Sequence, residues 1–234
     1  MSGSTFRSGS LLHAPTHMTH PPSPAPWRLY HTTGTCSQAV LIALYEADQD
    51  VDLAWVDFSS GQQRSPDYLS VNPKGRVPAL VTPQGVLTEV PALLTFVAQQ
   101  VPQALLAPLD DPFAFARLQG FNSYLSSTVH VAHAHMRRGS RWTDDPAAIE
   151  ALQRKVPQNM TEAFEYIEAE WLTPGPWVLG DRYSVADAYL FTIGLWLESD
   201  QVDVQKLPRL LAHRERMRAR PAVQRALNAL PPSV

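Results

Sequence analysis

The chain has 234 residues, 44% of them hydrophobic and 18% charged, so it can bury the core of one large domain or two small ones. A net charge of −3 argues against nucleic-acid binding, and no apolar run reaches the roughly 18 residues that cross a membrane. The single cysteine, Cys36, excludes an intrachain disulfide and is typical of a cytoplasmic protein.

Residues 1–26 are predicted to be a disordered tail. They contain five prolines and five serines but no acidic residue. Such a segment buries too little apolar surface to offset the entropy lost on ordering. Its longest apolar stretch is too short for a secretory signal, and Met18 is an alternative natural start.

Residues 27–101 alternate between strand and helix patterns. The predicted elements are a strand at 27–31, a helix at 37–48, strands at 53–58, 77–81 and 86–88, and a helix at 91–99. The last two strands are joined by a Pro-Gln-Gly turn, and a polar loop precedes them. The order β-α-β-loop-β-β-α predicts a compact α/β domain.

Residues 102–111 are predicted to be a linker, and residues 112–234 an all-α domain. Apolar stripes at helical spacing run through 121–132 and 149–171, and Pro157 is expected to kink the second of these helices. A variant capping box at 184–187 precedes a helix at 188–197. Because this helix is apolar all round, we expect it to be central and buried.

Cys36 lies between the end of the first strand and the start of the first helix. The free N–H groups and the positive dipole end of a helix favour a thiolate or another anion there. A buried structural cysteine is an equally good interpretation, because free cysteine is among the most buried residue types.

Four motifs in order carry a resemblance to a known family. They are the G-T-C-S turn at 34–37, N-P-K-G-R-V-P-A-L at 72–80, the hairpin end L-T-E at 87–89, and G-D-R-Y-S-V-A-D-A-Y-L at 180–190. Together they resemble the glutathione S-transferases, and the bacterial β class in particular. The resemblance implies a thioredoxin-like domain, an all-α domain, a homodimer and a role in detoxification. It implies glutathione as co-substrate with a hydrophobic electrophile, and no metal.

The resemblance also implies the site residues. Catalytic roles fall to Cys36, to Ser37 as an alternative hydroxyl, and to His130. Glutathione binding falls to Cys36, Arg76, Val77, Pro78, Glu89 and Val90, with a cis peptide before Pro78. The chain departs from the family at two positions, because Val90 replaces the usual Ser and Val131 the usual Lys. Loss of the Ser hydroxyl predicts weaker glutathione affinity.

Other residues have simpler interpretations. His130, His133 and His135 lack a carboxylate or cysteine at ligand spacing, so a metal site is not expected. Arg137, Arg138, Arg141 and Trp142 are interpreted as a solvated helix end, with a place in the cleft or a dimer interface as the alternative. Three functions stay open: glutathione transfer, thiol-disulfide or deglutathionylation chemistry through Cys36, and a non-catalytic scaffold on the same fold.

Overall fold

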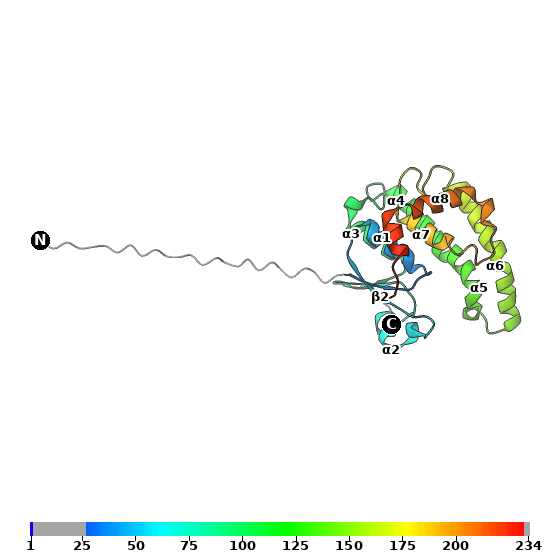
Figure 1. Cartoon of the computed structure of the whole chain (residues 1–234). Helices are drawn as coiled ribbons and strands as arrows, with labels where there is room; N and C mark the ends of the chain where they lie inside the picture. Colours follow the sequence, from blue (N-terminus) through cyan, green and yellow to red (C-terminus); the bar gives the residue numbers. More distant parts are fainter. Residues whose placement is uncertain (2–26, 232–234) are drawn as a thin grey trace.

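The computed structural model describes residue 1 and residues 27–231, so nearly all of the predicted tail lies outside the described residues. Four strands form one sheet in the order β2-β1-β3-β4 (Figure 1). They are β1 Trp27–His31, β2 Val51–Trp55, β3 Ala79–Thr82 and β4 Gly85–Thr88. β1 pairs parallel with β2 and antiparallel with β3, which pairs antiparallel with β4. The predicted α/β class of this region is confirmed.

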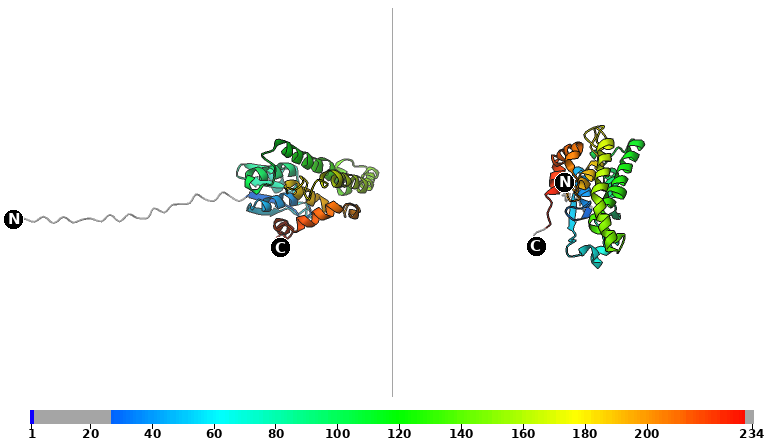
Figure 2. Two further views of the ribbon diagram at one scale, coloured as in Figure 1. Left: turned by 90° about the horizontal axis from the view of Figure 1, so that it is seen from above. Right: turned by 90° about the vertical axis from the view of Figure 1, so that its right-hand side faces the viewer.

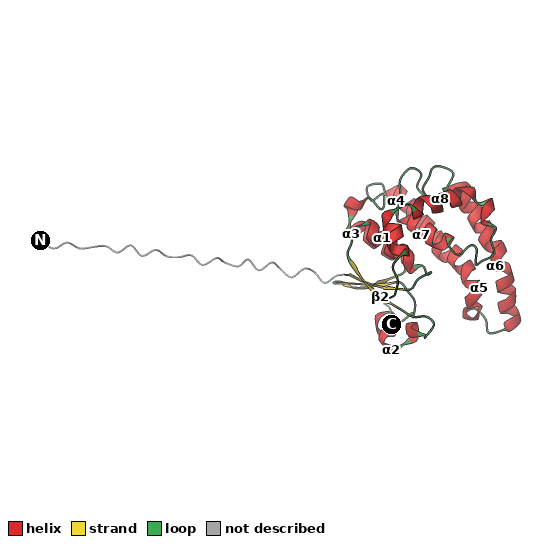
Figure 3. Ribbon diagram, in the orientation of Figure 1, coloured by secondary structure: helices red, strands yellow, loops and turns green. Residues whose placement is uncertain are grey.

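Helices cover both faces of the sheet, as Figure 3 shows. α1 (Ser37–Glu46) and α3 (Val90–Gln100) lie on one face and α2 (Pro66–Val71) on the other. α2 was not predicted, although Ser65 caps it by accepting a hydrogen bond from the N–H of Tyr68 at 3.2 Å. Tyr68 packs with Val56 and Val77 in a small core of its own, which anchors the segment that precedes β3.

Several predicted boundaries were wrong by two or three residues, because pairing and turns decide where elements end. β2 occupies 51–55 rather than 53–58, since its register with β1 runs from Val51 opposite Trp27 to Trp55 opposite His31. α1 ends at Glu46 rather than at residue 48, where the positive φ of Asp48 ends the helical path.

From residue 112 the described chain is helical, as predicted. The helices are α4 Pro112–Tyr124, α5 His130–Arg138, α6 Pro146–Tyr166, α7 Val185–Gly194, α8 Pro208–Arg218 and α9 Pro221–Leu227. α5 and α6 pack side by side (Figures 1 and 2). α6 continues through Pro157, so the kink there stays a prediction. No helix within 27–231 is long and apolar enough to cross a membrane.

α7 is the central helix, and all ten of its residues are buried, as predicted. It begins at Val185 rather than at residue 188, because Ser184 is its N-cap and Asp187, at its third position, completes the expected capping box. Asp187 also accepts a hydrogen bond from the N–H of Val178 at 2.8 Å and contacts Nε2 of His213 at 3.1 Å. Asp187 therefore connects the start of α7 to the loop at Val178 and to His213 of α8.

A single buried core extends from the sheet domain into the helical region and includes residues of α1, α3, α4 and α7. Arg220 of the last helices also pairs with Glu46 of α1 at 2.5 Å. The core packs across the predicted linker, so packing alone does not mark where one domain ends and the next begins. The domain boundaries 27–101, 102–111 and 112–234 therefore stay predictions.

Candidate functional site

Cys36 sits at the start of α1, directly after the turn that leaves β1. Its side chain is 9% exposed, and its Sγ lies 3.6 Å from the carbonyl oxygen of Val77, to which it donates. Burial raises the pKa of the thiol to about 12, although the nearby charges of Arg138 and Arg76 act to lower it. Of the two interpretations of Cys36, this raised pKa favours the buried neutral thiol over the thiolate, because desolvation is the largest influence on it.

Ser37 points away from the site. It is fully buried, and its hydroxyl lies 2.7 Å from Oγ1 of Thr35 and 2.8 Å from Nδ1 of His31. It lines neither of the cavities that Cys36 lines. Ser37 is therefore not placed for its expected catalytic role. Its hydrogen bonds instead stabilise the turn before α1.

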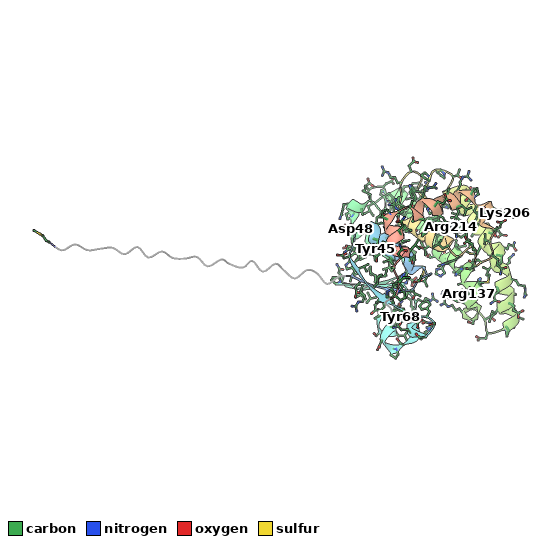
Figure 4. The ribbon with its side chains drawn as sticks, in the orientation of Figure 1. Tyr45, Asp48, Tyr68, Arg137, Lys206 and Arg214 are labelled. Carbon is green, nitrogen blue, oxygen red and sulfur yellow. The ribbon has the colours of Figure 1, made fainter. Side chains whose placement is uncertain are left out.

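One of these cavities is the Pro78 groove, of about 320 Å³. Cys36, Val77, Pro78, Glu89, Val90 and His130 line it, among others. The Val77–Pro78 peptide bond is cis, as the resemblance implied. Tyr68 Oη (Figure 4) and Asn72 Nδ2 both donate to the carbonyl of Arg76 at 2.6 Å, which fixes the segment in place.

The N–H of Val77 has no hydrogen-bond partner among residues 27–231. It faces no strand at this position, because the ladder with β1 begins only at Ala79. An extended peptide in the Pro78 groove can therefore pair with the backbone of Val77 as an added strand.

The far end of the Pro78 groove is formed by the start of α3. Glu89 has a φ of +73°, a left-handed conformation that costs a non-glycine residue of order 1–3 kcal/mol. Its carboxylate is exposed and contacts Nζ of Lys74 at 2.6 Å. Val90 is buried at the first position of the helix, where backbone N–H groups lack intrahelical partners. This end of the groove offers a carboxylate, an ammonium and free N–H groups to a zwitterionic ligand.

The second cavity is the Trp196 pocket, of about 170 Å³. Cys36, Arg64, Arg76, Arg138, Arg141 and Trp196 line it, together with His130 and His133. The Pro78 groove shares Cys36, Arg76 and His130 with it. The thiol therefore lies where two cavities meet.

His130 borders both cavities, as its expected role requires. Burial lowers its pKa to about 4, with smaller contributions from the charges of His133, Arg138 and Arg141. A catalytic role for His130 as a protonated acid at neutral pH is therefore not supported. A neutral imidazole at pH 7 can still donate or accept one hydrogen bond.

Sequence reasoning missed a cluster around Trp196. Nε1 of Trp196 donates to the carbonyl of Gly34 at 3.1 Å, which joins the helical region to the turn before Cys36. The ring of His133 stacks on Trp196 with centroids 4.3 Å apart, and Nδ1 of His133 lies 2.8 Å from the fully buried carboxylate of Asp200. Asp200 is 67 positions from His133, so no local pattern links them.

Three of the four residues interpreted as a solvated helix end follow the alternative interpretation and line the cleft. Arg138 and Arg141 line the Trp196 pocket, and Arg141 and Trp142 line the Pro78 groove. Arg137 (Figure 4) is exposed and lines neither cavity. The side chain of His135 packs on Trp142 instead of joining His130 and His133, and no metal-binding group of three ligands occurs in the described part of the chain.

Comparison with known proteins bears on this site. Residues 25–99 match the glutathione S-transferase N-terminal domain and residues 129–221 the C-terminal domain. The chain is 33% identical to glutathione S-transferase GstA of Escherichia coli O157:H7 over 86% of its own length and 98% of that protein.

Two solved structures are similar as well. A glutathione transferase homologue from Sulfitobacter, crystallised with bound glutathione, is 43% identical with a TM-score of 0.83, covering 86% of this chain and 96% of that one. A β-class glutathione S-transferase from Sphingomonas chungbukensis is 33% identical with a TM-score of 0.74, covering 86% and 96%. The chain therefore belongs to the glutathione S-transferase family.

Proposed function

We propose that this protein transfers the thiol of glutathione to small, hydrophobic electrophiles. The observation that carries the proposal is the Pro78 groove, which has peptide-pairing backbone at Val77, a zwitterion site at Glu89 and a thiol at Cys36. Glutathione is a tripeptide with an ammonium and a carboxylate on its γ-glutamyl end. An extended tripeptide can present its backbone, its thiol and its zwitterionic end to these three features.

The γ-glutamyl and cysteinyl parts of glutathione each have a partner in this arrangement. The γ-glutamyl ammonium pairs with Glu89, and the γ-glutamyl carboxylate is held by the N–H groups at the start of α3. The cysteinyl backbone pairs with Val77, which places the glutathione sulfur beside Cys36. Arg76 and Pro78 form the wall of the groove at this point.

The reaction is a nucleophilic substitution or addition by the glutathione sulfur. Cys36 remains a neutral thiol and turns its S–H from the carbonyl of Val77 to the glutathione thiolate, while the charges of Arg76 and Arg138 stabilise that anion. A carbon–sulfur bond forms, and in a substitution the leaving group departs with the bonding electron pair. His130 is neutral and orients one of the reactants by a hydrogen bond.

Reductase chemistry through Cys36 needs a thiolate as the attacking group. A pKa of about 12 disfavours that step at neutral pH, so glutathione transfer is the preferred function. Val90 and Val131 replace the usual Ser and Lys of the family, which is the reason for considering a non-catalytic scaffold. That alternative would be favoured only if the protein does not bind glutathione.

We further propose a homodimer that works in the cytoplasm, in detoxification, without a metal, a nucleic acid or a membrane as partner. Phe58 and the uncovered edge of Trp196 line the pocket beside Cys36 and suit a hydrophobic electrophile. Light scattering on the purified protein tests the dimer, and a single-chain mass at micromolar concentration would contradict it.

Calorimetric titration with glutathione tests the function. We expect saturable binding that Glu89→Gln weakens about tenfold or more, since the substitution removes a charge-assisted hydrogen bond. Glu165→Gln is the matched control, because Glu165 is exposed on α6 and lines neither cavity. A chain that ignores millimolar glutathione would end the proposal.

Activity of Cys36→Ser then separates the two enzymatic functions. A transferase retains conjugation of an aryl halide, because the serine hydroxyl also donates a hydrogen bond to the glutathione sulfur. A reductase loses all turnover of a mixed disulfide, because no thiol remains in the protein.

A further inference from the structure

Four arginines gather around the small Trp196 pocket beside Cys36. Arg64, Arg76, Arg138 and Arg141 come from three separate segments, namely the turn before α2, the segment before Pro78, and the end of α5 with the turn that follows. Arg64 Nη1 is so close to Gly75 that a Cβ there would lie 2.9 Å from it. This packing holds the Arg64 guanidinium beside the segment that carries Arg76.

None of these four guanidiniums contacts a carboxylate within residues 27–231. Two less exposed arginines elsewhere do have a carboxylate partner, since Arg214 contacts Glu198 at 2.7 Å and Arg220 contacts Glu46 at 2.5 Å. No acidic residue lines the Trp196 pocket.

Like charges this close repel one another. The pKa of Arg141 is lowered by burial and then by the charges of Arg138, Arg76 and Arg64. Arg64, Arg76 and Arg141 are exposed and Arg138 is half-buried, so water screens part of this repulsion, and an anion in the pocket relieves the rest.

Glutathione alone does not balance this charge. In the proposed binding mode its γ-glutamyl carboxylate lies at the start of α3, at the other end of the Pro78 groove. The glycyl carboxylate and the thiolate remain to face four guanidiniums. About two positive charges are then left beside the position of the electrophile.

We propose that the preferred electrophile is an aromatic compound that carries a carboxylate. This inference rests on the proposed glutathione transfer. The carboxylate is held by the guanidiniums of the Trp196 pocket, and the aromatic ring lies against Trp196 and Phe58. The glutathione sulfur attacks the ring carbon that bears a halide, the halide leaves with the bonding pair, and the carboxylate stays unchanged.

A matched pair of acceptors tests the proposal. One is a chlorodinitrobenzoate with the chlorine para to the carboxylate, and the other is the corresponding benzamide, which is neutral and nearly the same size. For each acceptor, kcat/KM is divided by its rate constant with glutathione in buffer, which removes differences in intrinsic reactivity. We expect this ratio to favour the carboxylate about tenfold or more, and the preference to shrink at high salt.

Arg141→Gln removes one guanidinium from the edge of the pocket, and Arg137→Gln is its matched control. Arg137 is exposed nearby on α5 but lines neither cavity. We expect Arg141→Gln to lower the carboxylate preference about tenfold and Arg137→Gln to leave it within about twofold, since only the first loses a charge-assisted contact. Because the readout is a ratio of two acceptors on one enzyme, a change in glutathione binding cancels.

The outcomes are distinct. Turnover of both acceptors without a carboxylate preference overturns this inference and leaves glutathione transfer intact. Turnover of neither, with no binding of glutathione, overturns the proposed function. If Arg141→Gln raises the KM for glutathione but not for its glycyl ester, and the acceptor ratio is unchanged, the arginines serve the glycyl carboxylate and the inference is wrong.

Discussion

Alkylation of Cys36 tests how the site uses its thiol, and the chain contains no other cysteine to obscure the result. Burial raises the pKa of this thiol from 9.0 to about 12. A rise of three units lowers the thiolate fraction at neutral pH about a thousandfold, whereas each thiolate gains roughly 16- to 32-fold in nucleophilicity. The native protein should therefore react about 30- to 60-fold more slowly than an unperturbed cysteine, before its small exposure slows it further.

The assay compares the rate of iodoacetamide addition at pH 7 in native buffer and in denaturing urea, followed by intact mass. Ser123→Cys in the Cys36→Ser background is the control, because Ser123 is exposed on α4 and should react at similar rates in both conditions. Native Cys36 that reacts as fast as the unfolded chain would refute the reasoning. It would identify an activated thiolate and favour the reductase alternative.

Three further predictions concern stability and binding. Asp187→Ala should lower the free energy of unfolding by about 3–5 kcal/mol, because it removes a helix cap and leaves the N–H of Val178 and the ring of His213 without their partner. Urea denaturation measures this loss, and a value below about 1 kcal/mol contradicts the prediction. The preference among acceptors should not change. Val90→Ser should tighten glutathione binding about 2- to 10-fold, because it restores one hydroxyl donor at the start of α3. Calorimetry measures the Kd, and an unchanged Kd would show that this hydroxyl does not contribute to glutathione binding. Burial lowers the pKa of both His31 and His130 to about 4, so between pH 6.5 and 4 the unfolded chain binds protons there that the folded chain does not. Stability should fall as the pH drops through this range, by up to about 3 kcal/mol for each histidine. A urea midpoint that stays constant from pH 7 to 4.5 would refute this prediction.

Much of the fold follows from short stretches of sequence. The apolar spacing of 37–46, the Ser184–Asp187 capping box and the uniformly apolar run after it predict helices, because a helix is specified by its own periodicity and caps. Strand ends and α2 were harder to predict. Pairing with β1 sets the limits of β2, and a six-residue helix offers too few turns for a periodic pattern.

The candidate site likewise has a part that the sequence predicted and a part that it did not. Cys36, Val77, Pro78, Glu89, Val90 and His130 were all named from motifs, and the structure brings them together around the Pro78 groove. Their chemical state was not predictable. Whether Cys36 is an anion depends on how deeply the folded chain buries it, and burial is the largest influence on the raised pKa of its thiol.

What the sequence determined by itself is the order of elements and the short motifs, since these depend on neighbours within a few residues of one another. Only the tertiary structure decided that Ser37 faces the turn, that Asp200 meets His133, and that Arg64 joins Arg138 and Arg141 around one pocket. These contacts join residues that are distant in the chain. Solvent exclusion and electrostatic interactions act through space, so the protonation of a group and the charge around it are set by segments that no local pattern specifies.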